Sequence, residues 1–210
     1  MRSRLRSGVL LAGGASARFG TPKGLAPFAG ARLADRPLGA LREVCDEVLV
    51  ASNDPRAAQW FPSYRVVTDV HGFRGGLSAL ATACVRAAHE TVVVCAWDMP
   101  FVTAALLDEL AAAVDDGARC CVPMHADHAF EPLCAAYRRT EAITAVTQIL
   151  ASSDDRSAHM LPGVLAGTEW RIDLHLATDD AARVFLNVNT RNDLELAQQW
   201  CAAHPSPTAP

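Results

Sequence analysis

Short aliphatic runs alternate with segments of helical periodicity along the first half of the chain. The runs are 9–11, 48–51, 65–67 and 92–95, and the helical segments are 33–44, 55–60, 77–88 and 103–114. Each run is almost wholly apolar, which is typical of strands buried on both faces, and each ends in polar or glycine-rich residues. This alternation predicts an α/β fold with three layers, α/β/α, around a mostly parallel, Rossmann-like sheet.

The second half of the chain has a less regular pattern. It predicts strands at 120–122, 132–137 and 185–188, and helices at 139–150 and 191–203. Thr190 and Asp193 stand where a capping box would begin the last helix. We find no internal repeat and no interdomain linker, so we expect a single domain over residues 1–202 and a flexible, proline-rich tail over 203–210.

Composition and charge exclude several classes of protein. Hydrophobic residues make up 50% of the 210 residues and charged residues 20%, which excludes disordered chains and coiled coils. The net charge is −4 and the basic residues cluster only at Arg2, Arg4 and Arg6, so we expect no nucleic-acid partner. The purely apolar runs fall far short of the ~18 residues of a spanning helix, so we expect no membrane partner either.

The amino terminus has the outline of a secretory signal, with three arginines, an apolar stretch and small residues at 15–17. The apolar stretch covers only 9–12, shorter than the ~7 residues of a signal core, so we interpret it as a buried first strand. The chain has seven cysteines without a CxxC pair, and their neighbours are mostly apolar. This usage indicates reduced thiols in a cytoplasmic protein rather than disulfides or a zinc site.

Candidate chemistry gathers after the strands, where open α/β sheets bind their ligands. Gly13 and Gly14 follow the first strand and allow backbone amides to approach an anion closely. Arg18 and Lys23 follow them and supply positive charge for a polyphosphate; a glycine turn with solvated basic residues is the alternative. Lys23 is the one lysine among 19 basic residues. Arginine bias explains the absence of other lysines, whereas a compact ammonium between crowded phosphates explains why this one is present.

The loop after the first strand reads LAGGASARFGTPK from Leu11 to Lys23. The pattern LAGGxSxRxGxxK at this place resembles the molybdenum cofactor guanylyltransferases (the MobA family), which are nucleotidyltransferases with a glycosyltransferase-A-like fold. Later segments extend the resemblance over about residues 8–200. They are Asn53 and Asp69 after the second and third strands, 97–101 after the fourth strand, 131–133 with Tyr137, and 185–190 with Asp193.

The resemblance implies a role for each residue after a strand. Asp98 would hold Mg²⁺, which typically takes one or two carboxylates together with phosphate oxygens and water; its alternative role is to cap a helix. Lys23 and Arg18 would hold the triphosphate and stabilise charge on the leaving pyrophosphate, so the catalytic residues would be Lys23, Arg18 and Asp98. The nucleotide would be bound by Leu11, Ala12, Gly13, Gly14, Lys23, Asn53, Asp69 and Asp98. The alternative roles are an ordinary helix start for Asn53 and a strand end for Asp69.

The implied reaction transfers GMP from GTP to the terminal phosphate of molybdopterin or Mo-molybdopterin and releases pyrophosphate. The attacking phosphate is ionised near neutral pH, so the reaction needs positioning and charge rather than a general base. Asn187 and Asn189 resemble family positions near the pterin, with turn formation as an alternative of equal weight, whereas we expect His125 and His128 to be solvated. Proteins of molybdenum cofactor biosynthesis and acceptor molybdoenzymes are the expected protein partners.

Three alternatives to this reaction are left open. Gly14 favours a guanylyl donor, because cytidylyl-transferring relatives tend to carry alanine there. A cytidylyltransferase for the same cofactor, a sugar-phosphate nucleotidyltransferase and a nucleotide-binding relative without turnover are the alternatives. The chain departs from the family pattern at Gly76, Ser78, Ala79 and Trp97, where proline, alanine, glycine and cysteine are usual. These departures leave the predicted metal and phosphate residues in place.

Overall fold

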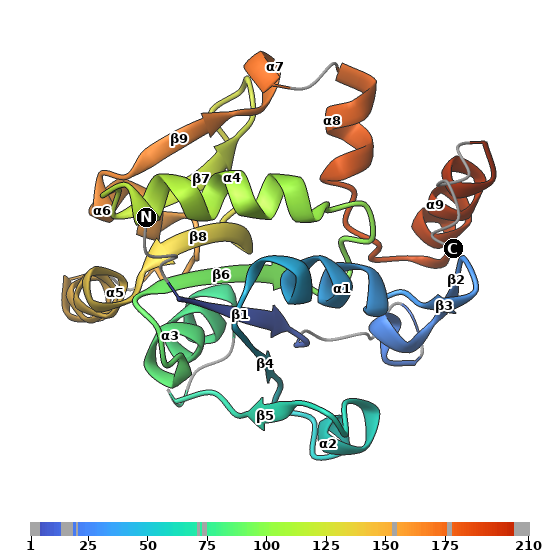
Figure 1. Ribbon diagram of the computed structural model, residues 1–210, viewed down its shortest axis with the longest axis horizontal. Helices are drawn as coiled ribbons and strands as arrows, with labels where there is room; N and C mark the ends of the chain where they lie inside the picture. The colour runs from blue at the N-terminus through green and yellow to red at the C-terminus, as the bar shows by residue number, and fades with distance from the viewer. Residues whose placement is uncertain are drawn as a thin grey trace.

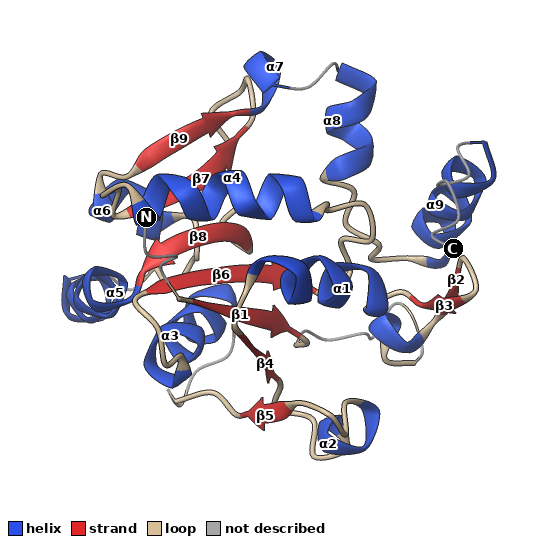
Figure 2. Ribbon diagram, in the orientation of Figure 1, coloured by secondary structure: helices blue, strands red, loops and turns tan. Residues whose placement is uncertain are grey.

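The computed structural model describes residues 5–13, 19, 21–70, 72, 75–152, 155–175 and 178–203. A seven-stranded sheet forms its centre, in the order β5-β4-β1-β6-β8-β7-β9 (Figures 1 and 2). The strands are β1 (Arg6–Leu11), β4 (Glu47–Ala51), β5 (Arg65–Val67), β6 (Thr91–Ala96), β7 (Cys120–Met124), β8 (Cys134–Arg138) and β9 (Thr168–Arg171). Within this sheet β8 runs antiparallel to both of its neighbours and the other strands are parallel, which confirms the predicted mostly parallel sheet.

Helices cover both faces of the sheet and complete the three layers. One face packs against α1 (Asp35–Val44) and α4 (Ala104–Asp115), which cross in front of the sheet in Figure 1. The other face packs against α3 (Gly76–Arg86), α5 (Arg139–Ser152) and α6 (Met160–Leu165). Alternate residues of β1 serve the two faces, since Leu10 lies in the first core and Val9 and Leu11 in the second. Burial on both faces is why the strand reads as a continuous apolar run.

The order in which the chain adds strands to the sheet reverses at β1, and the candidate site lies beside this reversal. From β1 the chain passes to β4 and then outward to β5, and it returns through α3 to β6 on the other side of β1. Leu10 pairs with Val50 on one side and with Cys95 on the other, so the carboxyl ends of β4, β1 and β6 lie level. Ligands of open α/β sheets bind in the crevice beyond such a reversal.

A third, smaller core lies beside this crevice. It joins the short 3-10 helix η2 (Lys23–Leu25), the hairpin of β2 (Pro27–Phe28) and β3 (Ala31–Arg32), and helix α9 (Arg191–Ala203). Phe28 and Leu33 pack there with Val188 and Ala197. The side chain of Phe101 meets Phe28 edge-on, with ring centroids 5.9 Å apart. Residues from three distant parts of the sequence are thereby held around η2.

The predicted last strand at 185–188 is wrong. Phe185 packs in the core beside α1 and α4, whereas Val188 packs in the core beside α9. The amide of Val188 donates to the carbonyl oxygen of Asp98 at 2.9 Å, in a loop rather than in a strand ladder. These apolar residues anchor a loop to two separate cores, and their spacing imitates that of a strand.

The last strand of the sheet is β9, which the sequence pattern did not predict. Its burial is slight, because Thr168 and Glu169 are exposed and Trp170 alone of its four residues is buried. The pattern also did not indicate the β2–β3 hairpin, α6, α7 (Ile172–His175) or α8 (Thr178–Val184). Such short or edge elements bury too few residues to leave a clear periodicity.

Helix α9 begins as predicted. The amide of Thr190 donates to Asp193 Oδ2 at 2.7 Å, and the amide of Asp193 donates to Thr190 Oγ1 at 3.2 Å, which is the reciprocal geometry of a capping box. The helix includes Ala203, so the predicted tail cannot begin before residue 204, and 204–210 lie outside the described residues. Among the described helices, none combines the length and the apolar character that crossing a membrane requires.

Candidate functional site

The polar residues that follow four parallel strands come together at one edge of the sheet. Gly13 follows β1, Asn53 follows β4, Asp69 follows β5 and Asp98 follows β6. Backbone hydrogen bonds join the first residues beyond the strands: the amide of Ala12 donates to the carbonyl of residue 51 at 2.8 Å, and that of residue 97 donates to the carbonyl of residue 11 at 3.2 Å. The sheet thus presents these loops as one surface beside the chain reversal.

Lys23 forms the centre of this surface. Its ammonium contacts Asp98 Oδ2 in a short ion pair and donates to Asn189 Oδ1 at 2.7 Å. The side chains of Lys23 and Asp98 are 12% and 9% exposed, so both charges are largely removed from water. A pair in this environment interacts more strongly than one on the open surface, and removal of one partner leaves an uncompensated charge.

Asp98 does not cap the following helix. Helix α4 begins at Ala104, and its N-cap is Thr103, whose Oγ1 accepts a hydrogen bond from the amide of Leu106 at 3.2 Å. The alternative role considered for Asp98 is therefore wrong. Its Oδ1 accepts no hydrogen bond from a described residue, so one carboxylate oxygen can accept a ligand while the other faces Lys23.

Asn53 and Asp69 form a second pair on the same edge. The Asn53 amide nitrogen donates to Asp69 Oδ2 at 2.8 Å, and the Asp69 backbone amide donates to Asn53 Oδ1 at 2.9 Å. Asn53 does not begin a helix, because α2 (Ala57–Trp60) has Arg56 as its N-cap. The two hydrogen bonds fix both side chains where the strands end, and Asp69 Oδ1 can accept a further hydrogen bond.

The two asparagines predicted to lie near the acceptor occupy different places. Asn189 lies at the Lys23–Asp98 pair, whereas Asn187 lines an open cavity of about 700 Å³. His125 lines the same cavity, and its Nε2 lies 2.9 Å from Glu131 Oε1. His125 was expected to be solvated, yet it is about one-third exposed and makes an ion pair or hydrogen bond with Glu131. This pairing could not be predicted from the sequence, because the two residues meet only through a loop turn.

Several predicted residues fall outside the described part of the chain. Gly14 and Arg18 are among them, so their predicted contacts with the nucleotide stay predictions. Gly13 is described and exposed, and a Cβ built there would meet no described atom within 4 Å. Packing against the described residues therefore does not require glycine at position 13.

The donor set around Asp98 fits a hard dication. Asp98 supplies a carboxylate oxygen and Asn189 an amide oxygen, and both face the same ammonium. Mg²⁺ takes one or two protein oxygens and completes its shell with water and phosphate. The described residues contain no group of three or more histidine, cysteine or carboxylate side chains placed to hold a metal ion. One carboxylate oxygen and one amide oxygen fit an ion whose remaining ligands are phosphate oxygens and water.

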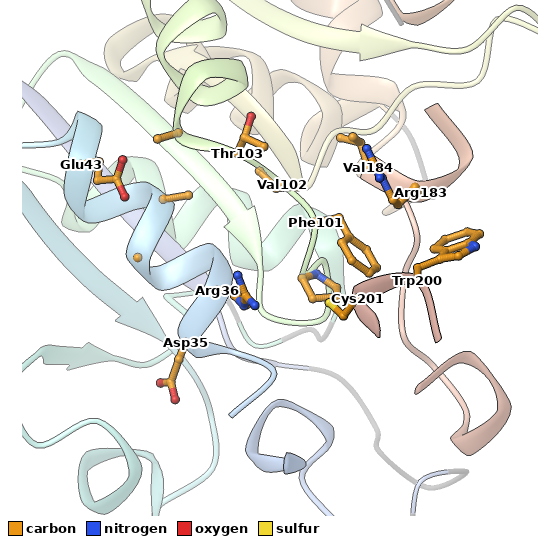
Figure 3. A pocket seen from close by; sticks show the side chains of 14 residues that line it. Asp35, Arg36, Glu43, Phe101, Val102, Thr103, Arg183, Val184, Trp200 and Cys201 are labelled. Carbon is orange, nitrogen blue, oxygen red and sulfur yellow. The ribbon is translucent and has the colours of Figure 1, made fainter. Parts of the chain in front are cut away.

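A separate cavity of about 480 Å³ lies between α1, the loop after β6, α8 and α9. Figure 3 shows Arg36 on its α1 side, Arg183 and Trp200 opposite, and Phe101 between them. None of the predicted site residues that the structure describes lines it. Cys201 does line it, and this thiol is partly exposed.

We expect Cys201 to be the one thiol that reacts rapidly in the native protein. Five of the seven cysteines are buried, and burial raises the pKa of Cys84 and Cys120 to about 12. Cys45 is partly exposed, but burial also raises the pKa of its thiol to about 12. Because the thiolate is the reactive form, these groups react slowly. Titration with a chromogenic disulfide should release about one equivalent from the native protein and none from Cys201→Ser, whereas two rapid equivalents would contradict this interpretation.

Known proteins resemble this chain along most of its length. Residues 8–172 match the model of the MobA-like NTP transferase domain. A probable molybdenum cofactor guanylyltransferase from Chloroflexus aggregans is 33% identical over 207 residues, which cover 93% of this chain and 95% of that protein. A molybdenum cofactor guanylyltransferase from Desulfosudis oleivorans is 26% identical over 200 residues, which cover 91% and 94% of the two chains.

Solved structures share the fold at lower identity. The molybdopterin-guanine dinucleotide biosynthesis protein A from Archaeoglobus fulgidus superposes with a TM-score of 0.74 at 23% identity, covering 95% of this chain and 100% of that one. A CMP:2-keto-3-deoxy-manno-octonic acid synthetase, solved with CTP, superposes with a TM-score of 0.68 at 14% identity, covering 95% and 99%. The chain therefore shares its fold with these nucleotidyltransferases.

Proposed function

Because the chain belongs to the family of MobA-like NTP transferase domains, we propose that this nucleotidyltransferase transfers GMP from GTP to the terminal phosphate of molybdopterin or Mo-molybdopterin. Pyrophosphate leaves, and a guanine dinucleotide cofactor is formed. The observation that carries the proposal is the desolvated Lys23–Asp98 pair at the chain reversal of the sheet. The names of the relatives that cover more than nine-tenths of the chain support guanylyl transfer in particular.

Lys23 and Asp98 have complementary tasks in this reaction. Asp98, with Asn189 beside it, would hold Mg²⁺, which supplies neutralisation of the phosphates when bound. The Lys23 ammonium then contacts a phosphate oxygen and stabilises the charge that develops on the leaving pyrophosphate. Arg18 assists in the same role. Because the attacking phosphate is already ionised, these residues contribute position and charge and need not remove a proton.

The loops after β1, β4 and β5 hold the nucleoside in this proposal. The backbone of 11–14 follows the phosphates and sugar, and Asn53 and Asp69 bind the base or ribose. A carboxylate such as Asp69 can accept hydrogen bonds from the N–H groups of a guanine edge or from a ribose hydroxyl. Their mutual hydrogen bonds hold the two side chains ready before the nucleotide arrives.

The acceptor occupies the cavity lined by Asn187, His125 and Glu131. Asn187 is two residues from Asn189, so this segment leads from the cavity to the Lys23–Asp98 pair. The proposal places the pterin in the cavity and its terminal phosphate toward the pair. The enzyme would act in the cytoplasm, and it would receive and deliver its pterin through other proteins of molybdenum cofactor biosynthesis and acceptor molybdoenzymes.

Isothermal titration with GTP, CTP and UTP in the presence of Mg²⁺ tests the donor. We expect GTP to bind at least ~10-fold more tightly than either pyrimidine nucleotide, which corresponds to ~1.4 kcal/mol. Asp69→Asn should reduce that preference, whereas Asp116→Asn, at an exposed site just after α4, should leave it unchanged. Tighter binding of CTP would favour the cytidylyltransferase alternative, and equal binding of all three would exclude a guanylyl-specific site.

A further inference from the structure

The ring of Trp97 lies directly against the backbone of Gly24. A Cβ built on Gly24 would lie 2.2 Å from Cε3, 2.6 Å from Cδ2 and 2.8 Å from Cζ3 of this ring. Real Cβ atoms do not come so close to other heavy atoms, and Trp97 is only 3% exposed, so the ring cannot swing into solvent. Only glycine fits at position 24 while tryptophan stands at position 97.

The two residues in contact are the chain neighbours of the two charged residues of the site. Gly24 follows Lys23 in the chain, and Trp97 precedes Asp98. The backbone on each side is fixed, since the Gly24 carbonyl accepts from the amide of Ala34 at 2.9 Å and the Trp97 amide donates to the carbonyl of residue 11 at 3.2 Å. A shift of either residue would therefore move its charged neighbour.

The Trp97 ring also stacks with a second tryptophan. The rings of Trp60 and Trp97 are stacked, with centroids 6.4 Å apart and planes 25° apart. Trp97 Nε1 is buried without a hydrogen-bond partner in the described structure, and an unpaired buried donor lowers stability. The indole N–H thus contributes no hydrogen bond to the fold, and the observed contribution of the side chain is the shape of its ring.

We infer that Trp97 is a positioning residue, whose ring, packed against Gly24 and stacked with Trp60, sets the separation of the Lys23 ammonium and the Asp98 carboxylate. The inference rests on the proposed function, because it assigns these two groups to the transfer of a nucleotidyl group. A misplacement of reacting groups by ~1 Å can lower a rate by ~100-fold.

A double-mutant cycle of Gly24→Ala and Trp97→Val tests the contact. Valine lacks all three ring atoms that approach Gly24, so it makes room for the added methyl group. We expect Gly24→Ala alone to lower kcat for pyrophosphate release by ~100-fold, with KM for GTP changed less than ~3-fold. In the Trp97→Val background the same change should cost less than ~3-fold. Gly39→Ala in α1, where a Cβ would meet no described atom within 4 Å, is the matched control and should keep the wild-type rate.

The inference would be overturned if Gly24→Ala lowered kcat by the same factor in the Trp97→Val background as in the wild type. It would also be overturned if Gly24→Ala alone kept the wild-type rate. If Gly24→Ala does not fold, Trp97→Val decides the question, because it should lower kcat at least ~10-fold while it stays folded; an unchanged kcat would overturn the inference. Thermal unfolding of the four proteins without nucleotide should show the same rescue. The unfolding temperature does not depend on the nucleotide donor. If the wild-type enzyme turned over no GTP, the proposed function would be refuted, but the effect of the Gly24–Trp97 contact on stability would still have been measured.

Discussion

We expect Asp98→Asn to lower Mg²⁺-dependent pyrophosphate release from GTP by at least ~100-fold, with the fold intact. Asparagine keeps the shape of the side chain but removes the charge that holds a dication. Loss of a single group that stabilises charge in a transition state costs ~10²–10³ in rate. The Lys23 ammonium loses its counter-charge in the variant, which should lower the unfolding temperature, but it keeps its hydrogen bond to Asn189 Oδ1. Asp98→Ala should lose as much activity.

Pyrophosphate release and the unfolding temperature should be measured on the same samples. The matched control is Asp108→Asn, because Asp108 also pairs with a basic residue, Arg6, but is 61% exposed and lies on α4 away from the strand ends. It should keep the wild-type rate. Binding of Mn²⁺ in the presence of GTP, followed by electron paramagnetic resonance, should weaken in Asp98→Asn only. Undiminished activity in Asp98→Asn would remove this residue from the metal site.

The second large effect is expected for Lys23→Arg, which preserves the charge. We expect kcat/KM to fall by ~100-fold, because the Lys23 side chain is 12% exposed and reaches both Asp98 and Asn189. A guanidinium is planar and larger than an ammonium, and its fork of donors cannot occupy the same point between crowded oxygens. Lys23→Met, which removes the charge, should lose at least as much activity.

Arg42→Lys provides the reverse change at an exposed position of α1 and should leave kcat/KM unchanged. Steady-state kinetics at saturating Mg²⁺ measures the effect, and the unfolding temperature reports any loss of fold. If Lys23→Arg retained near wild-type activity, arginine bias alone would account for the composition, and the single lysine would have no special task at the phosphates.

The central sheet and the strand-end residues could be predicted because burial leaves a strong pattern. β1, β4 and β6 are mostly apolar on both faces, β5 ends in two valines, and the parallel arrangement then brings the residues after these strands to one edge. β9 and α8 could not be predicted in this way, since they lie at the periphery and bury few residues. The segment 185–188 misled the pattern because its apolar residues enter two different cores.

In the site, as in the fold, single residues could be predicted from the sequence, whereas their contacts with distant residues could not. Asp98 and Lys23 could be found from a motif and a strand end, but their pairing depends on η2 and the small core beside α9. Asn187 and Asn189 share a predicted role, yet the loop turns between them and places one at the cavity and the other at Lys23. The contact of Gly24 with Trp97 joins residues 73 positions apart, and no local spacing reveals it.

A competition between nucleotide donors distinguishes guanylyl transfer from cytidylyl transfer to the pterin. The enzyme is incubated with Mg²⁺, molybdopterin and equal concentrations of GTP and CTP, each labelled at the α-phosphate, and the products are identified by mass spectrometry. We predict a guanine dinucleotide that carries the label, with one pyrophosphate released for each dinucleotide formed. A cytosine dinucleotide, or labelled nucleotide that is never transferred to the pterin, would contradict the account.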